Sequence, residues 1–114
     1  MERTDIVILL DIYGELLANA QRDALDMRYN DDLSLAEIAV EMGGVTRQSV
    51  LYSIRKGEQK LAELESKLGF MARLRELSGE IDQARDIVED MKKDSSDHHL
   101  DELGALLSEI RGGI

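Results

Sequence analysis

The residue types best suited to chemistry in this sequence lie next to one another near its middle, at positions 46 to 48. Arg47 and Gln48 carry planar groups that form paired hydrogen bonds, and in such pairs Arg recognises guanine and Gln recognises adenine. Thr46 is a residue type that caps helices, and the amides at a capped helix start can also receive a phosphate. The alternative is an ordinary solvated helix start, which short motifs of this kind also mark.

Two further cations, Arg55 and Lys56, are spaced to follow a phosphate backbone, and Tyr52 lies one helical turn before Lys56. The cations could equally be helical ion-pair partners, since Lys56 lies near Glu58 and Glu63, so both interpretations stay open. The predicted DNA-binding residues are Thr46, Arg47, Gln48, Tyr52, Arg55 and Lys56.

The remaining candidate chemistry is at His98 and His99, which have carboxylates beside them at Asp97 and Asp101. Adjacent histidines point to different sides of a helix and no second pair of ligands is present, so we expect a solvated helix start rather than a metal site. Paired acids elsewhere have no nucleophile or histidine partner, and cysteine is absent. The sequence therefore predicts neither a cofactor nor an enzyme.

The overall charge opposes nucleic-acid binding, because the chain of 114 residues has a formal net charge of −10 and both of its halves are acidic. Affinity for nucleic acid comes largely from releasing counterions from phosphates, so any binding must rely on a local patch and be sensitive to salt. No stretch is long and apolar enough to span a membrane, and no signal peptide is recognisable. Together with the absence of cysteine, this agrees with a cytoplasmic protein.

The elements that must position the basic cluster are helices. Proline is absent, and residues that lose little side-chain freedom in a helix are abundant, so an all-α fold is predicted. Within it, residues 34–57 are predicted to form a helix-turn-helix. Ser34 and Glu37 form a capping box that starts the first helix, Gly43–Gly44 ends it, and Thr46 caps the second. The predicted seam between the two helices consists of Ile38, Met42, Val45 and Val50.

Further helices are predicted on both sides of this motif. The first runs from about Asp5 to Ala18, and Asn19 is the candidate N-cap of a second, short helix. The inward stripe of the first helix is Ile6, Leu9, Leu10, Tyr13, Leu16 and Leu17. The helix after Thr46 is expected to reach Leu68 and to end at Gly69. A fifth helix follows over about 70–92, with Gly79 as its weak point, and a last helix ends before Gly112.

The apolar residues of the C-terminal helices exceed what the N-terminal core can bury. We therefore divide the chain into a helix-turn-helix bundle over residues 1–68 and a helical extension over 69–114. The extension is expected to pack on the first part or on a second subunit. A homodimer is the favoured outcome, because two-fold pairing also suits a helix-turn-helix that reads two half-sites.

Several segments resemble one known family. The run Asp11–Leu17, the pairs Gln21–Arg22 and Arg28–Tyr29, and the segments Asp32–Ala39 and Thr46–Val50 are similar to YlxM-type proteins. That family consists of small bacterial proteins whose helix-turn-helix is similar to the promoter-binding fourth region of sigma factors. The resemblance covers about residues 6–68 and fades in the C-terminal third.

The resemblance implies a cellular setting, since such proteins are usually encoded beside the genes for the signal recognition particle. The turn Met42–Thr46 is one residue longer than the family's usual turn, which changes the aim of the second helix. Leu51 stands where the family commonly has tyrosine, and Ala18 where it often has a capping threonine. Two functions remain open: a DNA-binding regulator, or a non-enzymatic adaptor that holds a protein or RNA component of the particle, with the acidic C-terminal helices as contact surface.

Overall fold

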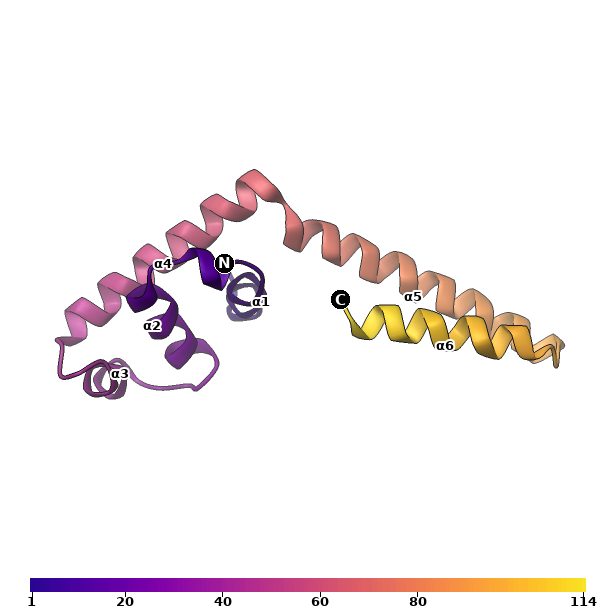
Figure 1. Cartoon of the computed structure of the whole chain (residues 1–114), viewed down its shortest axis with the longest axis horizontal. Helices are drawn as coiled ribbons and strands as arrows, with labels where there is room; N and C mark the ends of the chain where they lie inside the picture. Colours follow the sequence, from indigo (N-terminus) through magenta and orange to yellow (C-terminus); the bar gives the residue numbers. More distant parts are fainter. The chain divides into compact units, whose positions relative to one another are not determined.

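Helices are the only regular structure in the computed structural model, which describes residues 1–114, so the all-α prediction is confirmed. In chain order they are α1 (Arg3–Tyr13), the 3-10 helix η1 (Gly14–Leu16), α2 (Asn19–Tyr29), α3 (Leu35–Glu41), α4 (Arg47–Leu68), α5 (Phe70–Asp94) and α6 (His98–Gly112) (Figure 1). The chain divides into two compact units, Met1–Met71 and Ala72–Ile114. None of its helices is both long and apolar enough to cross a membrane.

In the first unit, α1, α2 and α3 pack against α4 (Figure 1). The core consists of Ile6, Leu9, Leu10, Tyr13, Leu17, Ala24, Leu25, Ile38, Ala39, Val50, Ile54 and Leu61. On α4, Val50, Ile54 and Leu61 recur at steps of four and seven residues, so they form one stripe along the helix. The opposite side of α4 is thereby left to solvent.

The first helix ends at Tyr13, earlier than the predicted end at Ala18. Gly14 starts the 3-10 helix, whose tighter winding takes the following side chains out of the α-helical phase. As a result Leu17 reaches the core, whereas Leu16, which was predicted to be buried, is 61% exposed.

The second helix begins without a side-chain cap, so the prediction of Asn19 as its N-cap is wrong. Ala18 has the extended backbone of the N-cap position, and Asn19 is the first helical residue. The side chain of Asn19 instead accepts a 3.5 Å hydrogen bond from Arg22. With alanine at the N-cap, the amides of the first turn gain no side-chain acceptor there.

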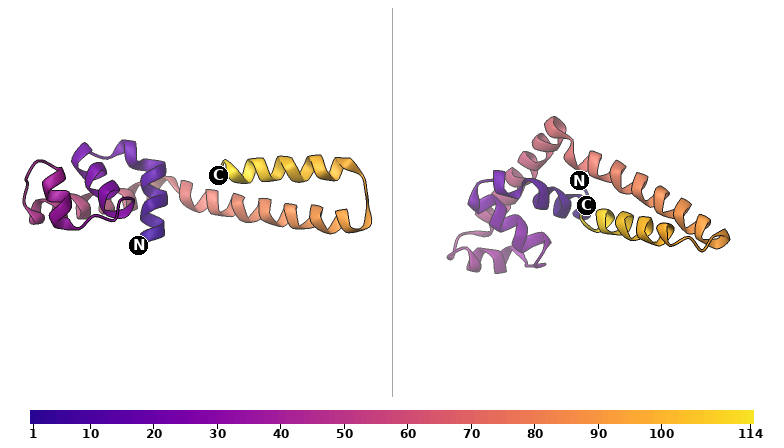
Figure 2. Two further views of the ribbon diagram at one scale, coloured as in Figure 1. Left: turned by 90° about the horizontal axis from the view of Figure 1, so that it is seen from below. Right: turned by 45° about the vertical axis from the view of Figure 1, so that its right-hand side comes forward.

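The second unit is a hairpin in which α6 runs antiparallel to the part of α5 that follows Ala72 (Figure 2). Two ion pairs join the helices: Lys92 Nζ lies 3.3 Å from a carboxylate oxygen of Asp101, and Arg111 Nε lies 3.1 Å from one of Asp82. These pairs are at the solvent-facing margin of the hairpin, where screening makes an ion pair worth little.

The core of the hairpin is small. Val88 is its only buried side chain, although aliphatic residues recur along both helices. Gly79 does not interrupt α5, which is continuous from Phe70 to Asp94. Packing between two helices alone therefore leaves most of the apolar surface of this unit uncovered.

Candidate nucleic-acid interface

The helix-turn-helix consists of α3, the turn Met42–Thr46 and α4. Its first helix begins with the predicted capping box. Ser34 Oγ accepts a 3.1 Å hydrogen bond from the amide of Glu37, and the Glu37 carboxylate accepts a 3.1 Å hydrogen bond from the amide of Ser34. The hydrogen bonds from the backbone and side chain of Ser34 favour the ionised carboxylate, so they lower the pKa of Glu37. The start of α3 is thus defined by local sequence.

Two glycines shape the turn, because both have the left-handed backbone that other residues rarely adopt. The φ angle is 91° at Gly43 and 84° at Gly44. The amide of Gly44 donates to the carbonyl of Ala39 at 2.9 Å, and that of Gly43 to the carbonyl of Val40 at 3.1 Å. This is the Schellman arrangement, which satisfies two carbonyl groups at the end of α3.

Val45 lies outside the seam between the two helices, which corrects its predicted burial. Ile38 and Val50 are fully buried and Ala39 lies beside them, whereas Val45 is 38% exposed. Met42 is half-buried. Two left-handed glycines directly precede Val45, and the seam is filled without its side chain.

At the start of α4, Thr46 is the N-cap, as predicted, and its Oγ1 accepts the amide of Ser49 at 3.0 Å. The amides of Arg47 and Gln48 have no partner in the helix and point toward its N-terminal end. The side chains of Arg47 and Gln48 are exposed, and the first turn contains no acidic residue. The N-terminus of α4 is therefore accessible to an anion.

The other three predicted site residues lie on the exposed side of α4. Gln48, Tyr52 and Lys56 follow one another at four-residue steps, so they form a row along the helix. Tyr52 is 64% exposed, and Lys56 Nζ lies 5.7 Å from the centre of its ring. Arg55 is exposed next to this row. All six predicted residues are thus exposed. Five lie on α4, and the sixth, Thr46, is its N-cap.

The cations of α4 have no ion pairs, unlike most of the other basic residues of the chain. The five residues concerned are Arg47, Arg55, Lys56, Lys60 and Lys67. Elsewhere an acid lies within ion-pair distance of, for example, Arg3, Arg73 and Lys92. The interpretation of Lys56 as an ion-pair partner of Glu58 therefore does not match the structure. The positive charge of this helix remains available to a partner.

Two tyrosines form hydrogen bonds with glutamates of α4, a feature that was not predicted. Tyr29 Oη donates a 2.5 Å hydrogen bond to Glu58, and Tyr13 Oη donates a 2.8 Å bond to Glu65. Burial, and next the bond to Glu58, raise the pKa of Tyr29 to about 12. Burial is also the main cause that raises the pKa of Tyr13. The bonds fix α4 to α2 and α1.

Gly57 allows α2 and α4 to approach closely. A Cβ atom on Gly57 would lie 2.6 Å from Leu25 Cδ1 and 3.3 Å from Gln21 Cβ. Because Leu25 is fully buried, its side chain has little room to move away. Gly57 therefore determines how closely α2 packs against α4, the helix that carries the exposed row of Gln48, Tyr52 and Lys56.

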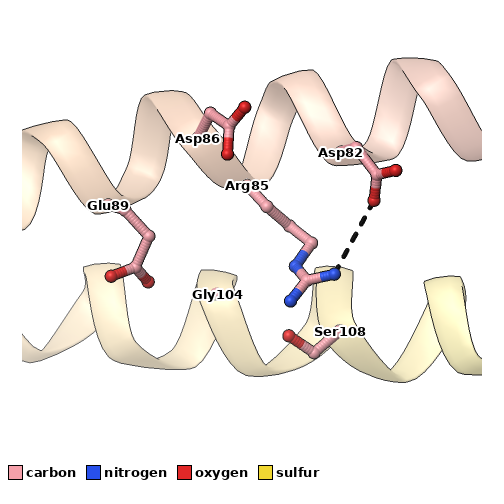
Figure 3. A pocket seen from close by; sticks show the side chains of 6 residues that line it. All are labelled: Asp82, Arg85, Asp86, Glu89, Gly104 and Ser108. Carbon is pink, nitrogen blue, oxygen red and sulfur yellow. Dashed lines mark ion pairs between the residues drawn. The ribbon is translucent and has the colours of Figure 1, made fainter.

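Two recesses of the surface are polar and are not enclosed. One, of about 370 Å³, lies beside Lys56 and Lys60 and is bounded by Leu16 and Gln21. Another, of about 260 Å³, lies between α5 and α6, where Arg85 Nη1 is 3.7 Å from Asp82 (Figure 3). No polar or charged residue of the chain is buried. Neither recess offers the desolvated groups that are typical of active sites.

The histidine pair is exposed, at the start of α6. One possible ligand atom from each of Asp97, His98 and His99 lies within 4.8 Å of the others. The Asp97 carboxylate, however, is the N-cap of α6 and accepts the amide of His99 at 3.0 Å. The cluster is thus accounted for by helix capping.

Comparisons with known proteins agree with the helix-turn-helix. A family model described as "Putative helix-turn-helix protein, YlxM / p13 like" matches residues 1–103. A UPF0122 protein of Clostridium kluyveri is 39% identical over 102 residues, which cover 90% of this chain and 91% of the relative. A UPF0122 protein of Desulforamulus reducens is 31% identical over 105 residues, which cover 92% of this chain and 89% of the relative.

A shorter match lies in a UPF0122 protein of Symbiobacterium thermophilum, which is 46% identical over 67 residues, 59% of this chain and 62% of the relative. The family description names a helix-turn-helix and no enzymatic activity. The capped helices, the glycine turn and these matches together assign the chain to the UPF0122 family of YlxM/p13-like helix-turn-helix proteins.

Proposed function

We propose that this protein is a cytoplasmic, non-enzymatic DNA-binding regulator, with α4 as its recognition helix. The observation that carries the proposal is the exposed face of α4, where Arg47, Arg55 and Lys56 have no ion pair in a chain of net charge −10. Between Arg47 and Gly57 the sequence has three basic residues and no acidic one. Such a local patch can release counterions from phosphates although the whole protein is acidic.

The polar site residues have three different roles in this proposal. Arg47 and Gln48, in the first turn of α4, contact base edges in the major groove, as the N-terminal residues of recognition helices do. The helix start capped by Thr46 receives a phosphate through its open amides. Arg55 and Lys56, in the helical turn after Tyr52, contact the phosphate backbone. These contacts fix the register of the protein on the DNA and do not depend on base sequence.

The proposal extends to the setting and to the assembly of the regulator. The family resemblance supports a part in the signal recognition particle pathway. A homodimer would present two recognition helices to two half-sites, and the uncovered aliphatic residues of the hairpin support pairing with a second copy.

A second candidate function is a non-enzymatic adaptor that holds a protein or RNA component of the signal recognition particle on the same scaffold. Two features favour it: the net charge of −10, and the Gly43–Gly44 turn, which the family resemblance implies is one residue longer than usual. The acidic helices α5 and α6 would then be the contact surface.

Selection from a pool of random-sequence duplex DNA at low salt tests the first function. The full chain is compared with Arg47→Ala and with Lys93→Ala, which removes an exposed cation of α5 that is paired with Asp90. We expect the wild-type chain to select a sequence motif. Arg47→Ala should bind that motif about 5- to 150-fold more weakly and lose its preference at one base position, whereas Lys93→Ala should bind like wild type. Equal binding and selectivity of wild type and Arg47→Ala would contradict the assignment. Co-purification of particle components that survives Arg47→Ala would support the adaptor instead.

A further inference from the structure

The recess beside Lys56 and Lys60 is lined by hydrogen-bond donors that have no partner. It has a volume of about 370 Å³ and lies between α4 and the start of α2, two helices that pack against each other (Figure 1). Four polar side chains that make no hydrogen bond and no ion pair within the chain form this basic recess: Gln21, Lys56, Gln59 and Lys60. Each ammonium group has three donors and each amide group has two, so donors outnumber acceptors there.

The charge of the basic recess is positive, although the chain as a whole has a net charge of −10. Two lysines and a single acid, Glu63, line it. Lys and Glu three residues apart on a helix commonly pair, yet no ion pair joins Lys60 to Glu63. Ala18, the N-cap of α2, also lines the recess and supplies no side-chain acceptor, so the start of α2 adds a partial positive charge.

The exposure of the basic recess suits an extended polyanion better than a small ligand. Lys56, Gln59 and Lys60 are exposed, and Gln21 is half-buried. Sites for small molecules enclose most of the ligand and are lined mainly by apolar groups. Contacts to the backbone of DNA, in contrast, are made at open surfaces by Lys and Gln side chains and by backbone amides. A phosphodiester backbone therefore matches both the donors and the openness of this recess.

The basic recess continues the exposed row of α4. Lys56 is the last residue of the row Gln48, Tyr52 and Lys56, and it also lines the recess. Lys60 follows Gln48 by 12 residues, which is about 18 Å along the helix axis. The major groove is only about 12 Å wide. When Gln48 is at the base edges, the end of the row at Lys60 thus lies at the rim of the groove, where the phosphates are.

We propose that the basic recess binds the phosphate backbone of duplex DNA at the rim of the major groove that α4 enters. The contact extends from α4 to the start of α2, through Gln21, and adds Gln59 and Lys60 to the residues that touch DNA. Such contacts hold the protein in register and do not depend on base sequence. This inference rests on the proposed DNA binding and concerns a part of the surface that the six predicted site residues do not include, apart from Lys56.

Fluorescence anisotropy with a short labelled duplex of mixed sequence, over a series of salt concentrations, tests the contact. Lys60→Gln removes a cation of the recess, and Lys67→Gln is the matched control, because Lys67 is an exposed cation of α4 that does not line the recess. Lys60→Gln should bind about 2- to 5-fold more weakly at low salt, with a slope of log K against log salt that is less steep by about one unit. Lys60→Arg and Lys67→Gln should resemble wild type.

The acid of the recess gives a change of opposite sign. Glu63→Gln removes the one negative charge that lines the recess, so this variant should bind the same duplex more tightly than wild type. Equal weakening by Lys60→Gln and Lys67→Gln, or no tightening by Glu63→Gln, would mean that only the overall charge of the protein matters. Either result would contradict a contact at the recess.

Acetylation of lysines with and without the duplex, read by mass spectrometry, detects the contact itself. Bound DNA should protect Lys56 and Lys60 from the reagent and leave Lys67 reactive. Unchanged acetylation of Lys60, in a protein whose salt slope still responds to Arg55→Ala, would overturn this inference alone. A wild-type chain without salt-dependent binding to the duplex would overturn this inference and the proposed function together.

Discussion

Tyr13 Oη donates a 2.8 Å hydrogen bond to Glu65 Oε1 and so links α1 to the last turns of α4. The same two groups also accept hydrogen bonds from backbone amides at the start of α5. Tyr13 Oη accepts a 3.2 Å hydrogen bond from the amide of Phe70, and Glu65 Oε1 accepts a 2.9 Å hydrogen bond from the amide of Met71. α4 ends at Gly69, which has a φ of 66°. A buried phenol and a glutamate thus provide the cap that α5 lacks in its own sequence.

Removing the hydroxyl of Tyr13 should destabilise the first unit. In Tyr13→Phe the amide of Phe70 loses its acceptor and Glu65 loses a donor, which should lower the free energy of unfolding by about 1–3 kcal/mol. Urea unfolding followed by circular dichroism measures this change. Tyr52→Phe is the control, because that exposed hydroxyl makes no hydrogen bond within the chain, and its effect should stay within about 0.5 kcal/mol. Equal stability of both variants would contradict the role of Tyr13.

The pKa values of the two bonded tyrosines predict a loss of stability at alkaline pH. Burial and the bond to Glu58 raise the pKa of Tyr29 to about 12, above its ordinary value of 10.0, and burial also raises that of Tyr13. A raised pKa favours the folded state in full below pH 10, and this contribution disappears as the pH rises toward 12. Ultraviolet absorbance of tyrosinate should show ionisation that continues above pH 10, and Tyr29→Phe should reduce the part that occurs near pH 12. Ionisation of every tyrosine near pH 10 would contradict the bonded arrangement.

Two Gly→Ala substitutions should have opposite effects on stability. Gly57→Ala places a Cβ 2.6 Å from Leu25 Cδ1 in the core, and the resulting strain of about 1–3 kcal/mol should exceed the gain in helix propensity. Gly79→Ala meets no atom within 4 Å and should stabilise α5 by up to about 1 kcal/mol. Thermal unfolding of both variants tests the pair. A stabilised Gly57→Ala variant would show that α2 and α4 do not approach closely there.

The parts of the fold that were predicted depend on local interactions. The capping box of Ser34 and Glu37, the cap of Thr46 and the helix end at Gly69 each involve residues within a few positions, so sequence alone identifies them. The bonds between Tyr13 and Glu65 and between Tyr29 and Glu58 join residues 52 and 29 positions apart. No periodicity indicates such pairs, because they depend on how the helices pack.

Errors arose where the winding or the length of a segment departs from the regular pattern. Leu16 fits the α-helical stripe of α1, but the 3-10 helix changes its direction, and only the position of Gly14 hinted at that change. Val45 was predicted to lie in the seam, but it follows the two left-handed glycines and is 38% exposed. For the candidate site, sequence identified the exposed cations of α4, whereas their lack of ion pairs became visible only in the structure.

The left-handed turn makes a prediction for Gly44. A Cβ at φ 84° is strained even though no atom lies within 4 Å, so Gly44→Ala should cost about 1–2 kcal/mol. Gly112→Ala, at an open position without positive φ, is the matched control and should change stability little. Denaturant titration compares the two variants. Similar midpoints for Gly44→Ala and Gly112→Ala would mean that the turn does not require left-handed glycine.

The salt dependence of DNA affinity tests the central claim, that the unpaired cations of α4 contact phosphates. Fluorescence anisotropy with a labelled duplex, repeated over a series of salt concentrations, gives the slope of log K against log salt for wild type, Arg55→Ala, Lys56→Ala and the control Lys93→Ala. The account predicts a negative slope that each α4 substitution makes less steep by about one unit, with Lys93→Ala like wild type. A slope near zero, or equal slopes for wild type and both α4 variants, would contradict it.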